Sequence, residues 1–281
     1  LHTQADINNV RCAYAEMEMV VVQDIFLTKS AEMAHVVLPA ACFYEKDGTF
    51  TNAERRIRRI RKAVDPPGLA LPDWEITCRL AGAMGYPMSY ESPARIMEEI
   101  ARCAPILGGV RYERLEGDGL IWPCPDREHP GTPILHQESF TRGRGRFSVL
   151  GNVETLETPD EQYPLILVTG RRLAHYNNGS MTRRCKGLAA LESEEEAEIH
   201  PDDAAGLGIV DGCLVMVVSR RGALEVLARV TERSRPGSVF MAFHHEEPLV
   251  NILTSPGVDE VAGTPEYKAC TVRLMPVVTT Q

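Results

Sequence analysis

The sequence lacks the features that mark membrane-spanning proteins, metal clusters and disulfide-rich domains. No apolar run approaches the roughly 20 residues that a bilayer-spanning helix needs, so we expect no membrane span. The eight cysteines are never closer than 21 residues, which excludes a CxxC metal or redox motif. Such scattered thiols are typical of a reducing compartment and favour a cytoplasmic location. The chain opens on Leu1 without an initiator methionine or a signal peptide, and we expect a fragment of a longer protein.

Positive charge is also in short supply, because 30 lysines and arginines face 39 aspartates and glutamates, and the net charge is −9. This balance argues against wholesale binding of nucleic acid or of an acidic membrane. Two runs of charged residues depart from an even distribution of charge along the chain. Residues 55–62 consist of arginine, isoleucine and lysine, and residues 191–199 carry five glutamates. We interpret both runs as solvated faces, with contact to a missing part of the protein as the alternative for the basic run.

The first third of the chain predicts an α/β layer with parallel strands. Residues 19–22 form a continuous apolar run that is typical of a buried strand, residues 28–35 predict a short helix, and residues 36–39 predict a second buried strand. This order predicts a parallel pair with a right-handed crossover. Because ligands of such sheets bind beyond the carboxyl ends of the strands, Gln23 and Asp24 lie at the expected binding edge. The alternative is that they only cap the next turn.

Two helices follow, with Asp73 and Ser92 as their expected N-caps. From residue 108 the chain loses periodicity and gathers glycine, proline and charge, which predicts an irregular connection. Beyond it, short β segments separated by turn signals, with one helix among them, predict a six- or seven-stranded β-barrel. The expected division is an α/β domain over residues 1–107, the connection over residues 108–162 and a barrel domain over residues 163–281.

A loop rich in glycine and hydrogen-bond donors, residues 169–182, follows the first predicted barrel strand. Backbone N–H groups approach a ligand closely at glycine, and arginine pairs bidentately with phosphate, so the loop suits a polar, anionic ligand. An ordinary surface loop is the alternative. His244 and His245, at the end of a later strand, invite a metal or catalytic interpretation, but we interpret them as polar residues at a rim.

Five stretches in order resemble one family, the molybdenum or tungsten oxidoreductases that bind bis-molybdopterin guanine dinucleotide. The stretches are VVQDIFLTKSA from Val21, AHVVLP from Ala34, EKDGTFTNAERR from Glu45, the loop from Thr169, and TPEYK from Thr264. The overlap covers nearly the whole chain, and within the family the sequence looks most like the C-terminal half of a formate dehydrogenase α subunit. The resemblance implies that the barrel is a double-psi barrel of the aspartate-decarboxylase-like type.

The resemblance also implies cofactor-binding residues. Gln23, Asp24 and Lys46 match positions that contact one guanosine portion of the cofactor, and Asp73 matches an acidic residue that recognises guanine. The loop after the first barrel strand matches the segment that holds the other dinucleotide and its pterin. Residues further along the chain match later positions that line the pterin side. The residues of this second set are Thr169, Gly170, Arg171, Arg172, Leu173, His175, Tyr176, Asn177, Asn178, Phe243, Asn251, Tyr267 and Lys268.

The residues that carry chemistry in the family cannot be mapped onto this chain, because the eight cysteines form no four-cysteine cluster. We therefore expect no catalytic or metal-ligating residue here, a 4Fe–4S cluster only in the missing N-terminal part, and no activity of the fragment alone. The complete enzyme is expected to oxidise formate to carbon dioxide and to pass two electrons through the bis-molybdopterin cofactor, with molybdenum or tungsten, to the cluster.

The expected partners are the remainder of the catalytic subunit and electron-transfer subunits, and not nucleic acid. Two alternatives stay open: a nitrate reductase relative of the same family, and a non-catalytic structural relative in a respiratory complex.

Overall fold

The computed structural model describes residues 1–151, 155–192, 194–247 and 249–277. The chain folds as two compact units. The barrel unit comprises residues 1–20, 28–33 and 151–281, and the α/β unit comprises residues 21–27 and 34–150. In the part of the chain that the structure describes, no helix is long and apolar enough to cross a membrane.

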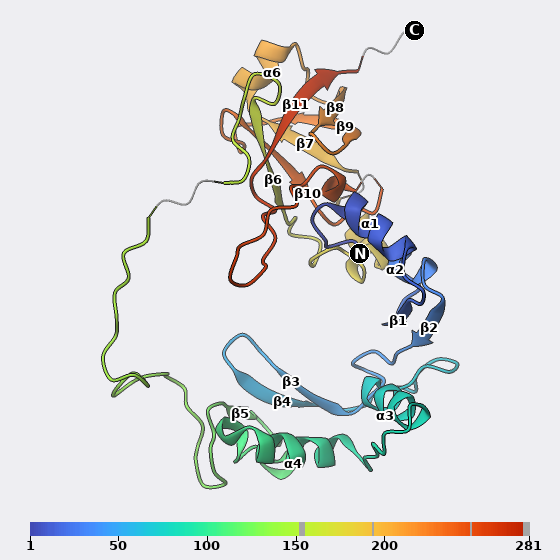
Figure 1. The fold of residues 1–281 in the computed structure, drawn as a ribbon, viewed down its shortest axis with the longest axis vertical. Coiled ribbons are helices and arrows are strands. Elements are labelled where there is room, and N and C mark those ends of the chain that lie inside the picture. The colour runs from blue at the N-terminus through green and yellow to red at the C-terminus, as the bar shows by residue number, and fades with distance from the viewer. Residues whose placement is uncertain (152–154, 193, 248, 278–281) are drawn as a thin grey trace. The chain divides into compact units, whose positions relative to one another are not determined.

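The barrel unit is built on a closed sheet of six strands in the order β10-β6-β11-β8-β9-β7 (Figure 1). The strands are β6 (Leu165–Gly170), β7 (Glu196–Ile199), β8 (Leu214–Val218), β9 (Ala223–Val230), β10 (Ser238–Ala242) and β11 (Cys270–Pro276). Side chains alternate across a strand, so Val215 and Val217 of β8 are fully buried while their neighbours are partly exposed. The predicted barrel is confirmed, with six strands.

The glutamate-rich stretch contains a barrel strand, and its interpretation as a solvated face is wrong for the second half. Strand β7 pairs parallel with β9 and antiparallel with β10. Its Ala197 and Ile199 are fully buried in the barrel core. Glu198 is also buried, and its carboxylate forms an ion pair with Arg172 at 2.7 Å. This pairing lets a charged residue occupy a strand of the core.

Short helices and the N-terminal segment surround the barrel. The helices are α1 (Ile7–Ala15), α2 (Lys29–Glu32), α5 (Lys186–Ala189) and α6 (Pro201–Leu207), with 3-10 turns at Thr182–Arg184 and Val250–Ile252. Helix α6 ends at Gly208, whose φ of 68° is the left-handed conformation typical of a helix C-terminus. The N-terminal segment docks through fully buried Ile7 and through Asn8, which donates to the carbonyl of Arg221 at 3.3 Å.

Glu157 anchors the segment that leads into β6. Its carboxylate accepts from the backbone N–H of Thr271 at 2.9 Å and pairs with Arg220 at 3.4 Å and with Arg221. Burial acts to raise the pKa of Glu157. The hydrogen bonds from Arg221 and Thr271 nevertheless hold this pKa below its ordinary value. A carboxylate with a lowered pKa in the folded state contributes stability above its ordinary pKa and loses it as the pH falls.

We expect Glu157→Gln to lower the free energy of unfolding of the barrel unit by about 2 to 3 kcal/mol, because two arginines lose their shared counter-charge in a buried site. Denaturant unfolding at neutral pH measures this. The difference in free energy of unfolding between the variant and the wild type should shrink at acidic pH, where Glu157 is protonated. Exposed Glu161 on the same segment is the control, and an equal loss in Glu161→Gln would refute the anchoring role.

The α/β unit contains two sheets. Strands β1 (Val21–Asp24) and β2 (Val36–Pro39) pair in parallel with Val21 opposite Val36, as predicted. The prediction that both strands are buried is wrong, because Val21, Val36 and Val37 are exposed in this two-stranded sheet. A three-stranded antiparallel sheet consists of β3 (Gly48–Thr51), β4 (Arg56–Ile60) and β5 (Leu120–Ile121). The helices are α3 (Asp73–Ala83) and α4 (Pro93–Cys103), with 3-10 turns at Pro105–Leu107 and Tyr112–Leu115. The core of this unit consists of Ile57, Met97, Val110, Leu115, Leu120 and Cys124.

The basic run forms strand β4 and is largely neutralised within its own unit. Ile57 is buried in the core, as the alternation of a strand requires. Glu116 pairs with Arg59 at 2.5 Å and with Arg61, and the Arg59 guanidinium lies 4.8 Å from the Tyr112 ring centre. The run is therefore a half-buried strand and not the freely solvated face that its composition suggested.

Candidate functional site

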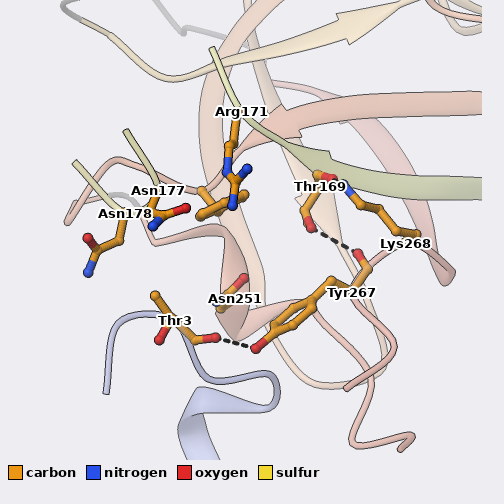
Figure 2. A pocket seen from close by; sticks show the side chains of 9 residues that line it. Thr3, Thr169, Arg171, Asn177, Asn178, Asn251, Tyr267 and Lys268 are labelled. Atoms are coloured by element: carbon orange, nitrogen blue, oxygen red, sulfur yellow. Dashed lines mark hydrogen bonds between the residues drawn. The ribbon is translucent and has the colours of Figure 1, made fainter. Parts of the chain in front are cut away.

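A pocket of about 670 Å³ lies in the barrel unit beside the carboxyl ends of β6 and β10. Eight of its nine lining residues belong to the set that the sequence singled out. The lining residues are Thr3, Thr169, Arg171, Asn177, Asn178, Phe243, Asn251, Tyr267 and Lys268 (Figure 2). The structure thus brings together residues from four separate stretches of sequence around one cavity.

The parallel pairing of β6 with β10 explains why these segments meet. Gly170 lies opposite Ala242 in the register, so both strands end at the same edge and deliver Arg171 and Phe243 there. Gly170 must be glycine, because a Cβ at this position would lie 2.3 Å from a ring carbon of Phe240. The absence of a side chain lets the backbone turn into the pocket at this point.

The loop reaches the pocket through a tight turn at its two asparagines. Asn177 has a φ of 50°, a left-handed conformation that asparagine tolerates better than most residues. The side-chain oxygen of Asn178 accepts from the backbone N–H of Ser180 at 3.2 Å, which closes the turn. The residue types of the loop therefore suit the backbone turn at Asn177 and hold the Asn178 side chain in place.

Two cations line the pocket, and no acidic residue does. Arg171 has no ion-pair partner within the described ranges, and the Lys268 ammonium donates to the backbone carbonyl of Thr169. Burial, and next the nearby charge of Arg171, lower the pKa of Lys268. An uncompensated pair of cations in a cavity is suited to an anion such as a phosphate.

The pocket also presents an acceptor without a donor. Asn251 is buried, and its side-chain nitrogen donates to the carbonyl of His2 at 3.1 Å. Its side-chain oxygen has no partner among the described residues. Such a buried acceptor is costly unless a bound group supplies an N–H or O–H. Tyr267 closes this side, since its hydroxyl donates to the carbonyl of Thr3 (Figure 2).

Five predicted residues of the loop do not line the pocket. Gly170 lies beneath it, and Leu173 and Tyr176 are exposed to solvent. The Arg172 guanidinium pairs with three glutamates, Glu192 at 3.9 Å, Glu196 at 3.4 Å and Glu198 at 2.7 Å. His175 is buried, and its Nδ1 is hydrogen-bonded to the Thr182 hydroxyl at 3.0 Å.

A second group of predicted residues meets in the α/β unit. Asp73 accepts from the Gln23 side-chain amide at 2.7 Å and pairs with Lys46. Partial burial acts to raise the pKa of Asp73. The hydrogen bonds from Lys46 and Gln23 nevertheless hold this pKa below its ordinary value. Asp24 stays apart from this trio, and its carboxylate accepts from the backbone N–H of Phe26 at 3.3 Å.

The structure corrects two interpretations near these sites. Asp73 is the first residue of α3 rather than its N-cap, which is Pro72, and its carboxylate serves the trio instead of the helix end. His244 and His245 are buried and not rim residues. Thr3 was missed, because it lies before the first stretch with a recognisable pattern and contributes to the pocket only through distant contacts.

Two family models match the chain. Residues 1–83 match the molybdopterin oxidoreductase model, and residues 165–271 match the molydopterin dinucleotide binding domain. The second match covers five of the six barrel strands, the start of β11 and most of the pocket lining.

The chain is also similar to α subunits of formate dehydrogenases. It is 51% identical over 274 residues to the F420-dependent formate dehydrogenase 2 subunit alpha of Methanococcus maripaludis, covering 96% of this chain and 40% of that protein. It is 48% identical to the F420-dependent formate dehydrogenase subunit alpha of Methanocaldococcus jannaschii, covering 96% of this chain and 41% of that one. Formate dehydrogenase H of Escherichia coli is 38% identical, covering 99% of this chain and 40% of that protein. The chain spans about two fifths of the length of these relatives.

Among solved structures, acetylene hydratase from Pelobacter acetylenicus has a similar fold, with a TM-score of 0.69 and 18% identity over 97% of this chain and 42% of that one. The two family matches, the relatives and the closed barrel agree with one another. The chain belongs to the molybdopterin oxidoreductase family and carries its molydopterin dinucleotide binding domain.

Proposed function

We propose that this chain is the cofactor-binding portion of a formate dehydrogenase α subunit, which in the complete protein oxidises formate to carbon dioxide. The observation that carries the proposal is the pocket with two uncompensated cations, Arg171 and Lys268, and the unpartnered acceptor of Asn251. Phosphates match the cations, and the N–H groups of a pterin match the acceptor. The residues present therefore fit a pterin dinucleotide.

We propose further that the two groups of residues serve two dinucleotides. Arg171, Lys268, Asn177, Asn178 and Asn251 hold one of them in the barrel unit. In the α/β unit, the trio of Gln23, Lys46 and Asp73 holds the guanosine portion of the other, with Asp24 beside it in sequence. We propose that the functional division follows the two compact units, with Thr3 on the side of the barrel pocket and residues 108–150 on the side of the trio.

When bound, the bis-molybdopterin cofactor supplies a molybdenum or tungsten centre that accepts two electrons from the substrate. The residues of this chain bind and orient it. Cations neutralise its phosphates, amide side chains fix its polar rings, and the Asp73 carboxylate accepts from a guanine edge. We place the substrate-contacting residues and a 4Fe–4S cluster in a part of the protein outside these 281 residues.

The electron acceptor that we propose is F420, through a partner subunit. Relatives named for F420 share 45 to 51% identity with this chain, against 38% for formate dehydrogenase H.

The eight cysteines are free thiols, which suits a protein of the cytoplasm.

The test is an assay of the complete protein with formate as donor and F420 or an artificial dye as acceptor, together with metal and pterin analysis. Formate-dependent reduction by a pterin-loaded protein is expected. Reduction of nitrate without formate oxidation would instead favour a nitrate reductase relative, and a protein without metal and pterin would favour a structural relative. Both outcomes would overturn the proposal.

A further inference from the structure

Three histidines of the barrel unit stack into a buried column. The rings of His175 and His244 lie 4.2 Å apart with an interplanar angle of 19°, and those of His244 and His245 lie 4.0 Å apart. Their exposed fractions are 4%, 1% and 9%. The His244 and His245 rings are tilted by 40° to each other, and all three rings are buried, so this column is a packed element and not a set of surface residues.

Several polar atoms of the column lack partners among the described residues. They are Nε2 of His175, both ring nitrogens of His244, and Oε2 of Glu195. Glu195 is 4% exposed, and its Oε1 accepts from the backbone N–H of Ala242 at 3.0 Å. Its Oε2 lies 3.9 Å from Nε2 of His245. A proton on this oxygen, donated to the imidazole after a small closure, satisfies both atoms with one hydrogen bond.

Burial favours the uncharged forms of Glu195, His244 and His245, while the charge of Arg172 acts to lower the pKa of Glu195. The charged or titratable groups that act on the column from outside it are His2, Arg172, Arg183 and Glu196. Burial raises the pKa of Glu195 to about 8. Burial and the neighbouring histidines and arginines lower the pKa of His244 to about 3 and that of His245 to about 4. At neutral pH His244 and His245 are neutral and the Glu195 carboxyl group keeps its proton.

The column joins the two segments that end at the pocket. His175 belongs to the loop that presents Arg171 and Asn177, and the Thr182 hydroxyl accepts from the backbone N–H of Tyr176 at 3.3 Å in the same loop. His244 and His245 directly follow Phe243, which lines the pocket from the other segment. Any change in the stacking therefore acts on both sides of the cavity.

We propose that a protonated Glu195, hydrogen-bonded to a neutral His245 beneath the stacked rings of His244 and His175, forms a positioning cluster that holds the two segments of the pocket in place. Its residues position the loop and do not themselves take part in chemistry. The cluster is formed by residues of this chain and does not depend on a bound cofactor. Only its role in binding a pterin dinucleotide rests on the proposed function.

The proton on Glu195 is tested by infrared spectroscopy of the complete protein. The C=O stretch of a protonated carboxyl group lies apart from the bands of a carboxylate, so a difference spectrum between wild type and Glu195→Gln should contain this band at neutral pH. It should disappear as the pH rises beyond about 8. Glu194→Gln, at the neighbouring exposed residue, is the control and should leave the band unchanged. A difference spectrum with carboxylate bands only would overturn the proposal.

Thermal unfolding gives a second readout of the same proton. When folding raises the pKa of a glutamate, the protein loses stability as the pH rises from the ordinary pKa of that glutamate to the raised pKa. The Tm of the wild type should therefore fall more steeply between about pH 4.5 and about pH 8 than the Tm of Glu195→Gln, and the two curves should run parallel above about pH 8. Parallel curves for the two proteins across the lower range as well would contradict a buried, protonated carboxyl group.

The stacking is tested with two variants of His244. Alanine removes the middle ring, and we expect trypsin to cleave the loop after Arg183 or Arg184 about tenfold faster in His244→Ala. Phenylalanine keeps a ring between the other two imidazoles, so His244→Phe should restore protection. Equal rates in wild type and His244→Ala, or no rescue by phenylalanine, would refute the positioning role. These measurements use neither formate nor cofactor, so they fail or succeed independently of the proposed function.

Discussion

Replacing Arg171 by glutamine should lower the molybdopterin content of the complete protein by about tenfold to a hundredfold. A hydrogen bond from arginine to a charged acceptor is worth about 1.5 to 3 kcal/mol, and each 1.4 kcal/mol is tenfold in affinity. Arg171 lines the pocket with Lys268 and has no ion-pair partner in the part of the chain that the structure describes. The measurement is pterin and metal per folded polypeptide, with folding checked by thermal unfolding.

The neighbouring arginine is the matched control. Arg172 pairs with Glu192, Glu196 and Glu198, and Glu198 is buried. Arg172→Gln should therefore cost about 3 kcal/mol of stability, because it leaves a buried carboxylate without its partner. Its cofactor content per folded molecule should stay near that of the wild type. Equal cofactor losses in both variants would mean that Arg172 also reaches the ligand, as the family resemblance implied.

The second large effect is expected for Asp73→Asn, which should lower the guanine nucleotide content of the complete protein by at least about tenfold. The Asp73 carboxylate accepts from Gln23 and pairs with Lys46, so both side chains are oriented by its charge. An asparagine turns one of its two acceptor positions into a donor and loses the charge that holds Lys46. Removal of a charged acceptor from a ligand site costs about 2 to 4 kcal/mol of binding.

The stability of the cofactor-free protein should change little in Asp73→Asn, since the side chain is half exposed and surface ion pairs contribute at most about 1 kcal/mol. Asp65 provides the control, because it forms an exposed pair with Lys62 at 2.6 Å in the same unit. Asp65→Asn should keep the full nucleotide content. Full content in Asp73→Asn as well would leave the trio as a structural ion pair.

The strands that follow hydrophobic alternation could be predicted from the sequence, and those governed by charge pairing could not. Residues 224–230 alternate in part, residues 214–218 form a short apolar run between turn signals, and the two segments form β9 and β8. Strand β7 was hidden, because its glutamates are neutralised by Arg172, which lies 24 residues away in sequence from Glu196. Strand β4 was hidden for the same reason, since the partner of Arg59 is Glu116, 57 residues away. Local patterns carry no information on such distant partners.

The site shows the same division. The residue types of the pocket could be recognised in sequence, but the direction of each side chain could not. Arg171 and Arg172 are adjacent and chemically identical, yet one faces the pocket and the other faces the glutamates of β7. This difference depends on the strand end after Gly170 and on the charge of a neighbouring strand, both of which require the folded barrel.

The long-range closure of the barrel unit has a consequence for the order in which the protein is made. The hydrogen bonds that dock the N-terminal segment onto the barrel join residues 213 to 264 positions apart, such as Asn8 to the carbonyl of Arg221 and Tyr267 to the carbonyl of Thr3. Translation proceeds from the N-terminus, so residues 1–15 must wait on the ribosome without their docking surface until the residues up to Tyr267 have emerged. Because Thr3, Asn251, Tyr267 and Lys268 come together only then, the pocket cannot receive a ligand during synthesis. Loading must be a step that follows translation, and truncation before Lys268 should abolish it.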